Sequence, residues 1–313
     1  MMPSATFGSV SRRCARRFLA AAALAPPQWK TNGFYRLCAW LYRRAQFNRD
    51  DLVTSNLGIS QFLRCAVPMS KDVYAFGQPR QVKSERATIS LVLALLADCR
   101  CIVDVGANEG IFTFLAHDIY PTLRLHWFEP DRRLAERLRS NLAANGIDHV
   151  GNRCAVSDRT GDAVFFENAT DDFSGSLTQL FADKHEMRAV PVHTIRLSDY
   201  FVEHAIENAL VKIDVEGAGK LVWAGLGREF RSIRYLVMEM LAPEIEAGLP
   251  RRITEEAGFA AYYICDFDLV HSKAGDFLYV EPFWNWLFCR LQPEELAARL
   301  AGTDFRVVTE EGA

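Results

Sequence analysis

Apolar and polar residues alternate in two rhythms along the central part of the chain. Short segments rich in apolar residues predict strands at residues 101–105, 123–128, 210–213 and 235–240, and a further strand is predicted at residues 150–156. Between them, apolar residues recur every three or four positions and predict helices at residues 111–118, 131–145, 197–204 and 218–226. Shorter extended segments are predicted at residues 163–166 and 193–195. Strands that alternate with helices in this way indicate βαβ units and a mostly parallel sheet.

The pattern changes toward both ends of the chain. A helix at residues 250–257 is followed by two apolar runs, at 260–265 and 276–280, which predict an antiparallel hairpin at one edge of the sheet. We expect a helical tail over residues 283–313 and a partly helical extension over residues 1–82. The α/β domain is therefore expected over residues 83–282.

Charge separates the extension from the rest of the chain. The 313 residues carry 36 basic and 39 acidic side chains, but residues 1–49 hold nine Lys or Arg and no Asp or Glu. The remaining residues hold 27 basic and 39 acidic side chains. This acidic body argues against a nucleic-acid-binding protein, whose surface needs an excess of basic groups.

Cysteine spacing and the length of the apolar runs bear on location. The eight cysteines are scattered and do not form pairs at metal-ligand spacing, so buried, reduced thiols and a cytoplasmic location are expected. The apolar stretch at residues 18–27 is too short to cross a bilayer. The arginines ahead of it fit a targeting peptide, a packed basic helix or an arm that contacts anionic lipid at a membrane surface.

Two signals follow the first two predicted strands. Residues 102–110 (IVDVGANEG) form an apolar strand that ends in a glycine turn, which is where doubly wound sheets bind nucleotides. The spacing of Gly106 and Gly110 is not the G-x-G-x-x-G of dinucleotide sites, and a tight strand–helix connection is the simpler alternative. Glu129 lies 23 residues after Gly106, at the end of the next strand, where an acid typically binds ribose hydroxyls.

A pair of carboxylates follows the strand at residues 210–213. Taken as strand residues, Asp214 and Glu216 point to one face and into one crevice. Together they could hold a substrate hydroxyl, a metal ion or an ammonium group. The alternative is a helix amino terminus, where the helix dipole favours Glu216.

These residues resemble the FkbM family of S-adenosylmethionine-dependent methyltransferases. The similar stretches are VDVGANEGIFT (103–113), FEPD (128–131), AVSDRTGDAVFF (155–166), SGSL (174–177), VHTIRLSDYF (192–201), LVKIDVEGA (210–218) and LVMEM (236–240). The resemblance implies a class I, Rossmann-like fold: a doubly wound, mostly parallel seven-stranded sheet whose last strand is antiparallel. One departure is Gly219, where the family usually has a further acid.

The resemblance also implies roles for individual residues. S-adenosylmethionine is the expected cofactor, and no metal is assigned. The residues expected to line the cofactor are Asp104, Gly106, Ala107, Asn108 and Gly110 at its methionine part, Glu129 at its ribose, and Ala155 and Val156 at its adenine. Asp214 and Glu216 are expected to face the transferred methyl group, and one of them would take the proton of an acceptor hydroxyl.

The function expected from this resemblance is O-methylation of a hydroxyl on a sugar, a glycan or another small metabolite. A different possibility is a non-catalytic Rossmann-like binding or assembly subunit, but retention of the turn glycines and all three acids speaks against it. A nicotinamide-dependent oxidoreductase is disfavoured by the glycine spacing. His193 is a reserve candidate for the base, and the loop at residues 173–176 is a candidate lid.

Overall fold

The computed structural model describes residues 52–54, 62–64, 83–168, 175–179, 187–272 and 283–309. The chain divides into two compact units, Met1–Gln81 and Val82–Ala313. In the first unit, β1 (Leu52–Thr54) pairs antiparallel with β2 (Phe62–Arg64). The helices expected within residues 1–49 and the lipid-binding arm lie outside the described residues.

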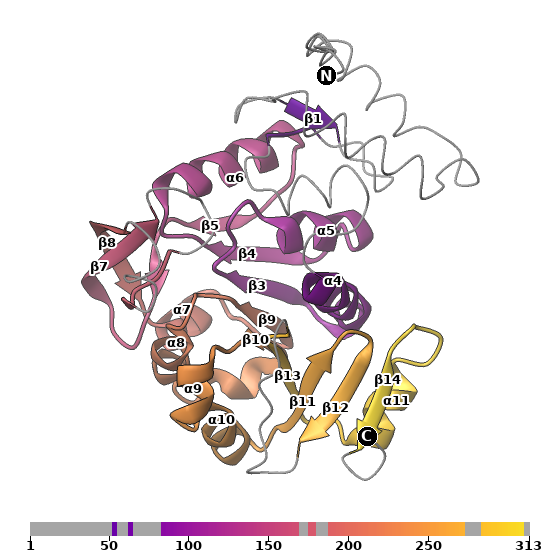
Figure 1. Ribbon diagram of the computed structural model, residues 1–313. Coiled ribbons are helices and arrows are strands. Elements are labelled where there is room, and N and C mark those ends of the chain that lie inside the picture. Colours follow the sequence, from indigo (N-terminus) through magenta and orange to yellow (C-terminus); the bar gives the residue numbers. More distant parts are fainter. Residues whose placement is uncertain are drawn as a thin grey trace, which may run out of the picture. The chain divides into compact units, whose positions relative to one another are not determined.

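The second unit is built on a nine-stranded sheet with the order β14-β12-β11-β13-β10-β9-β3-β4-β5 (Figure 1). Its strands are β3 (Cys101–Val105), β4 (Arg124–Phe128), β5 (Val150–Asn152), β9 (Ala209–Ile213), β10 (Ile233–Glu239), β11 (Ala260–Cys265), β12 (Asp268–Ser272), β13 (Asn285–Cys289) and β14 (Arg306–Thr309). The five strands from β10 to β5 are parallel, and β13 runs antiparallel between β10 and β11. The predicted class I fold is therefore confirmed, with β12 and β14 as two additional strands.

Helices cover both faces of this sheet (Figure 1). One face carries α4 (Lys83–Leu95), α5 (Ile111–Ile119) and α6 (Arg132–Ala144); the other carries α7 (Leu197–Glu203), α8 (Gly219–Leu226), α9 (Ala242–Glu246) and α10 (Leu249–Ala257). A further helix, α11 (Pro293–Arg299), precedes β14, and the short 3-10 helices η2 (Leu96–Asp98) and η3 (Glu229–Ser232) precede β3 and β10.

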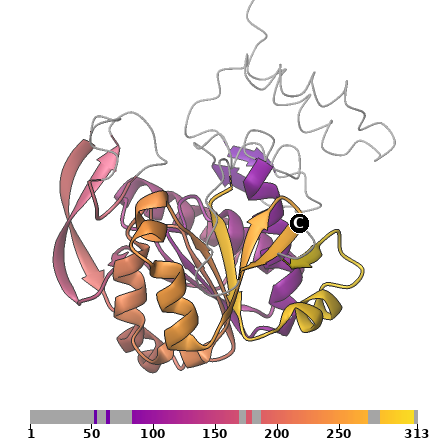
Figure 2. The same cartoon turned by 60° about the horizontal axis from the view of Figure 1, so that its bottom comes forward.

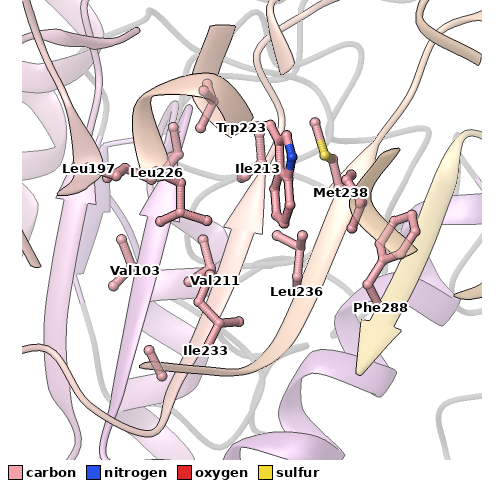
Figure 3. Packing of buried hydrophobic residues seen from close by; sticks show 14 of the residues in the cluster. Val103, Leu197, Val211, Ile213, Trp223, Leu226, Ile233, Leu236, Met238 and Phe288 are labelled. Atoms are coloured by element: carbon pink, nitrogen blue, oxygen red, sulfur yellow. The ribbon is translucent and has the colours of Figure 1, made fainter. Parts of the chain in front are cut away.

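The side-chain alternation of the strands decides what faces each helical layer. Val103 and Val211 are fully buried and gather with Trp223 of α8 in the main core (Figure 3). Burying an aliphatic side chain of this kind contributes about 1.5–3 kcal/mol. The next residues along β3 and β9, Asp104 and Lys212, point to the opposite face because successive strand residues alternate. The central strands thus carry two charged groups under α4 and α5.

The single strand predicted at residues 150–156 was wrong. The main sheet receives only β5, and β6 (Ala155–Val156) belongs to a second sheet of order β6-β8-β7, with β7 (Gly161–Asn168) and β8 (Met187–Ile195). This sheet lies at the left of both ribbon views (Figure 2). The polar residues Asn152 and Arg153 lie between the two apolar ends of the segment, where the chain leaves β5 for β6.

The helical tail predicted at residues 283–313 was wrong on both sides of α11, because β13 precedes that helix and β14 follows it. Residues 285–289 form β13, which lies in the middle of the sheet with every residue buried. Its apolar run fits a strand buried on both faces as well as a helix, and periodicity cannot separate the two. The hairpin partner of β11 is β12, whereas the run at residues 276–280 lies outside the described residues. Among the helices that the structure describes, none is long and apolar enough to cross a membrane.

Candidate active site

The predicted site residues gather at the carboxyl ends of β3, β4 and β9. Gly106 follows β3, Glu129 follows β4 and Asp214 follows β9. Backbone hydrogen bonds join the three loops: the N–H of Asp214 donates to the carbonyl of Val105 at 3.0 Å, and the N–H of Gly106 donates to that of Phe128 at 3.0 Å. The fold therefore brings these parts of the sequence to one edge of the sheet.

Both glycines of the first loop are required by contacts within the protein. Gly106 has a φ of +78°, and a β-carbon there would lie 1.8 Å from the carbonyl oxygen of Asp214. Gly110 has a φ of +81°, and its β-carbon would lie 2.2 Å from Leu138 Cδ1 of α6. Ala107 between them is buried and its N–H also donates to Phe128. The contact of these residues with a cofactor stays a prediction.

Glu129 links the loop after β3 to the start of α6. It is buried, its Oε2 accepts the N–H of Asn108 at 2.8 Å, and its Oε1 accepts the N–H of Asp131 at 2.8 Å. Asn108 has a left-handed backbone (φ 52°), and Asp131 caps the start of α6. Burial raises the pKa of Glu129 to about 8. Each of its oxygens has a second lone pair, so the carboxylate can still accept a ligand hydroxyl.

Asp104 lies between Thr113 and Lys212. It is fully buried, and its Oδ2 accepts the hydroxyl of Thr113 at 3.1 Å. Its Oδ1 makes no hydrogen bond within the described part of the chain and lies 3.6 Å from Lys212 Nζ. Burial raises the pKa of Asp104, and Lys212 opposes that rise. Direct contact between Asp104 and an ammonium group of the cofactor stays a prediction.

Lys212 was missed as a site residue. It lies beside Asp104 in the register of β9 and β3, and its Nζ is 3.1 Å from Asp214 Oδ2. The signal in the sequence was a lysine inside an apolar strand, two positions before Asp214. At that spacing its side chain lies on the same face as Asp214. A buried ammonium group needs a partner of opposite charge in place of water.

The two expected catalytic carboxylates meet a third. Strand β9 ends at Ile213, so Asp214 and Glu216 converge through a turn rather than through strand alternation; Glu216 and Gly217 both have positive φ, at 51° and 83°. Oxygens of Asp214, Glu216 and Glu239 lie within 4.8 Å of one another. Glu239 ends β10, beside β9, and was also missed. These three groups could hold a divalent cation.

The charges around Glu239 and Glu85 are crowded. Burial and the carboxylates of Asp214 and Glu216 raise the pKa of Glu239 well above its usual value. Its Oε2 is buried and makes no hydrogen bond to any described residue. Burial and Asp214 raise the pKa of Glu85, on α4, to about 7. The site thus contains more carboxylates than cations.

Ser176, which is not part of the main sheet, hydrogen-bonds the turn that carries Asp214 and Glu216. Its hydroxyl donates toward the carbonyls of Glu216 at 2.8 Å and of Val215 at 3.2 Å. Its own backbone pairs with Phe166 of β7 in both directions. Of the segment proposed as a lid, Gly175 and Ser176 are described, and residues 173 and 174 lie outside the described ranges.

The remaining predicted residues lie away from the carboxylates or within the core. Ala155 and Val156 are buried in β6, beside β8, so their place at an adenine ring stays a prediction. His193 is on β8, 3.7 Å from the exposed Asp162 of β7. At Gly219, the space for a β-carbon is filled by Met238 Cε at 2.1 Å and by Glu244 Oε1 at 2.8 Å. A side chain at position 219 would therefore need Met238 or Glu244 of α9 to move.

Five parallel strands with the antiparallel strand β13 beside them, and a glycine turn next to paired acids at their carboxyl ends, are the features of a class I methyltransferase. The chain belongs to the FkbM family: residues 104–277 match the methyltransferase FkbM domain. It is 31% identical over 166 residues to 2-O-methyltransferase NoeI of Sinorhizobium fredii, covering 48% of this chain and 68% of the relative. It is 30% identical over 168 residues to 31-O-demethyl-FK506 methyltransferase FkbM of Streptomyces tacrolimicus, covering 44% and 64%. The chain is therefore a methyltransferase.

Proposed function

We propose that this enzyme transfers the methyl group of S-adenosylmethionine to a hydroxyl oxygen of a sugar, a glycan or another small metabolite. The observation that carries the proposal is the direct contact between the Gly106 loop and Asp214, which puts a carboxylate beside the expected donor loop. The names of the two relatives, which specify 2-O and 31-O positions, support oxygen as the acceptor atom.

The chemistry of the site suits this cofactor. Lys212 pairs with Asp104 and Asp214, while Glu216 and Glu239 lie beside Asp214. Buried oxygens of Asp104 and Glu239 make no hydrogen bond within the described part of the chain. A surplus of carboxylate favours a ligand with positive groups, because buried charges need a partner of opposite sign. Glu129 would bind the ribose, Asn108 would lie at the methionine part, and Ala155 and Val156 would border the adenine.

In the reaction, the sulfonium of the bound cofactor supplies an activated methyl group. The protein holds the acceptor hydroxyl in line with it, and such orientation contributes about 7–11 kcal/mol. Of the two predicted acids, Asp214 is assigned as the base, because Lys212 Nζ at 3.1 Å holds its carboxylate beside the Gly106 loop. Its carboxylate hydrogen-bonds the hydroxyl and takes the proton as the new C–O bond forms. Glu216 and Glu239 bind the groups of the acceptor that lie next to the reacting hydroxyl.

Two measurements test this proposal. Calorimetric titration should show micromolar binding of S-adenosylhomocysteine and no binding of NADH. Incubation of the enzyme and labelled S-adenosylmethionine with glycan and lipid extracts should label a product through an ether linkage. We expect Asp214→Asn to lower the rate about 10²–10⁴-fold while S-adenosylhomocysteine still binds.

A matched control is Asp162→Asn, which makes the same change at a carboxylate whose side chain is 98% exposed, and it should leave the rate unchanged. Failure to bind S-adenosylhomocysteine, or full activity in both Asp214→Asn and Glu216→Gln, would refute the proposed function.

We also propose a cytoplasmic location for the enzyme. The cysteines that the structure describes (Cys99, Cys101, Cys154, Cys265 and Cys289) are all free, as expected in a reducing compartment. Contact of the basic segment at residues 1–49 with anionic lipid stays a prediction. Neutralising Arg12, Arg13, Arg16 and Arg17 should weaken sedimentation with phosphatidylserine vesicles if the prediction is right, because each basic group near such a surface contributes about 1 kcal/mol.

A further inference from the structure

Lys212 occupies the boundary between the expected donor and acceptor sides of the site. Its ammonium group donates to the carbonyl oxygen of Gly106 at 3.2 Å. It also lies 3.1 Å from Asp214 Oδ2 and 3.6 Å from Asp104 Oδ1. Among the described residues, the ion pairs found for these two aspartates both come from Lys212. One side chain therefore serves a loop after β3 and a loop after β9.

Burial makes these contacts obligatory. The side chain of Lys212 is only 6% exposed, and removing an unpaired ammonium group from water costs several kcal/mol. Burial alone would lower the pKa of Lys212, but the carboxylates of Asp214, Asp104 and Glu85 raise it above its usual value. Lys212 stays charged, and its position is set by the groups that surround it. The ring of Phe112, 4.9 Å from Nζ, bounds the same space.

The same two loops also touch through their backbones. The carbonyl of Asp214 fills the space of a β-carbon on Gly106, and the N–H of Asp214 bonds to Val105. A displacement of Asp214 is therefore transmitted to the Gly106 loop by two routes, one through the backbone and one through Lys212. Only the side-chain route depends on charge.

We propose that Lys212 is a positioning residue that couples the two sides of the site, because its ammonium group fixes both the Gly106 carbonyl and the Asp214 carboxylate. This inference rests on the proposed function, in which the first group lies on the side of the methyl donor and the second on the side of the acceptor. Its consequence is that a change at Asp214 alters cofactor binding, although Asp214 itself serves the acceptor.

A double-mutant cycle on cofactor binding tests the coupling. The probe is S-adenosylhomocysteine, titrated calorimetrically into the wild type, Lys212→Met, Asp214→Asn and the double variant. We expect Lys212→Met to weaken binding at least tenfold and Asp214→Asn to weaken it at least threefold. In the Lys212→Met background, Asp214→Asn should have no further effect, because the coupling side chain is gone. Lys212→Arg should restore binding to within about threefold of the wild type.

Controls separate this role from a general loss of structure. Lys220→Met makes the same substitution at an exposed lysine on α8 and should leave binding unchanged. Thermal unfolding checks each variant; if Lys212→Met does not fold, Lys212→Gln carries the cycle with the same expectation. Equal effects of Asp214→Asn in both backgrounds, or wild-type affinity in Lys212→Met, would overturn the coupling. If the wild type does not bind the probe, the proposed function fails, and this role fails with it.

Discussion

The carbonyl oxygen of Asp214 lies 1.8 Å from the point that a β-carbon on Gly106 would occupy. Contact with the loop after β9 is therefore the main reason for a glycine at position 106, and the approach of a ligand is a secondary one. Gly106→Ala should be destabilised by the left-handed backbone, about 1–2 kcal/mol, and by the overlap, about 1–3 kcal/mol more. Urea unfolding measures the sum.

The control for this prediction is Gly146→Ala. Gly146 also has a positive φ, +65°, but nothing lies within 4 Å of its β-carbon position. In Gly146→Ala the free energy of unfolding should fall only by the cost of the left-handed backbone, about 1–2 kcal/mol. Equal losses in the two variants would mean that the Gly106 loop moves away from Asp214 without cost.

Glu129 should make stability depend on pH. Its pKa in the folded state is about 8, above its ordinary value of 4.5, so the folded state holds a proton that the unfolded state releases. The favourable contribution is complete below pH 4.5 and is lost as the pH rises toward 8. The free energy of unfolding of the wild type should therefore fall by a few kcal/mol over this range relative to Glu129→Gln, whose amide does not titrate. Denaturant titrations at successive pH values measure the difference, and parallel curves would contradict the prediction.

The buried ion pair between Arg137 and Glu109 should matter more than surface pairs do. Arg137 of α6 lies 2.9 Å from Glu109 in the first loop, and their side chains are 12% and 0% exposed. Arg137→Met removes that cation from a buried carboxylate and should cost about 3–5 kcal/mol. Arg132→Met breaks a pair on the same helix whose side chains are 71% and 56% exposed, and it should leave the free energy of unfolding almost unchanged. Similar losses in chemical denaturation would show that the buried pair is not special.

Strand β13 offers a test of the fold itself. Phe288 is fully buried in the main core, where Figure 3 shows it beside β10, so Phe288→Ala should cost about 3–5 kcal/mol. Val202, which is 72% exposed on α7, provides the contrast: Val202→Ala should stay within about 0.5 kcal/mol of the wild type. A small loss at Phe288 would place residues 285–289 outside the core.

The elements best predicted from the sequence were those that alternate in burial or repeat at helical spacing. Residues 131–145 show such a repeat, and α6 ends within one residue of the prediction. Two other segments were harder. Residues 150–156 contain a change of sheet that single-residue hydrophobicity does not show, and residues 285–289, which are buried throughout, fit a strand or a helix equally well.

The site was predicted where the chemistry is local in sequence. Gly106, Glu129 and Asp214 each end a strand, and parallel strands end at the same edge. Lys212 and Glu239 were missed because their relevance depends on the order of strands: Lys212 becomes a partner of Asp104 only when β9 lies beside β3, and Glu239 approaches Asp214 only when β10 lies beside β9.

The hydroxyl of Ser176 donates to the backbone carbonyl groups of Val215 and Glu216 in the turn that carries Asp214 and Glu216. Hydrogen bonds to backbone carbonyl groups do not involve the side chains of those residues. The support that Ser176 gives to this turn therefore does not depend on the side chain at position 216. If Glu216 binds the acceptor as proposed, a substitution there that adopts the same positive φ of 51° would change the bound acceptor and leave the hydrogen bonds of Ser176 in place.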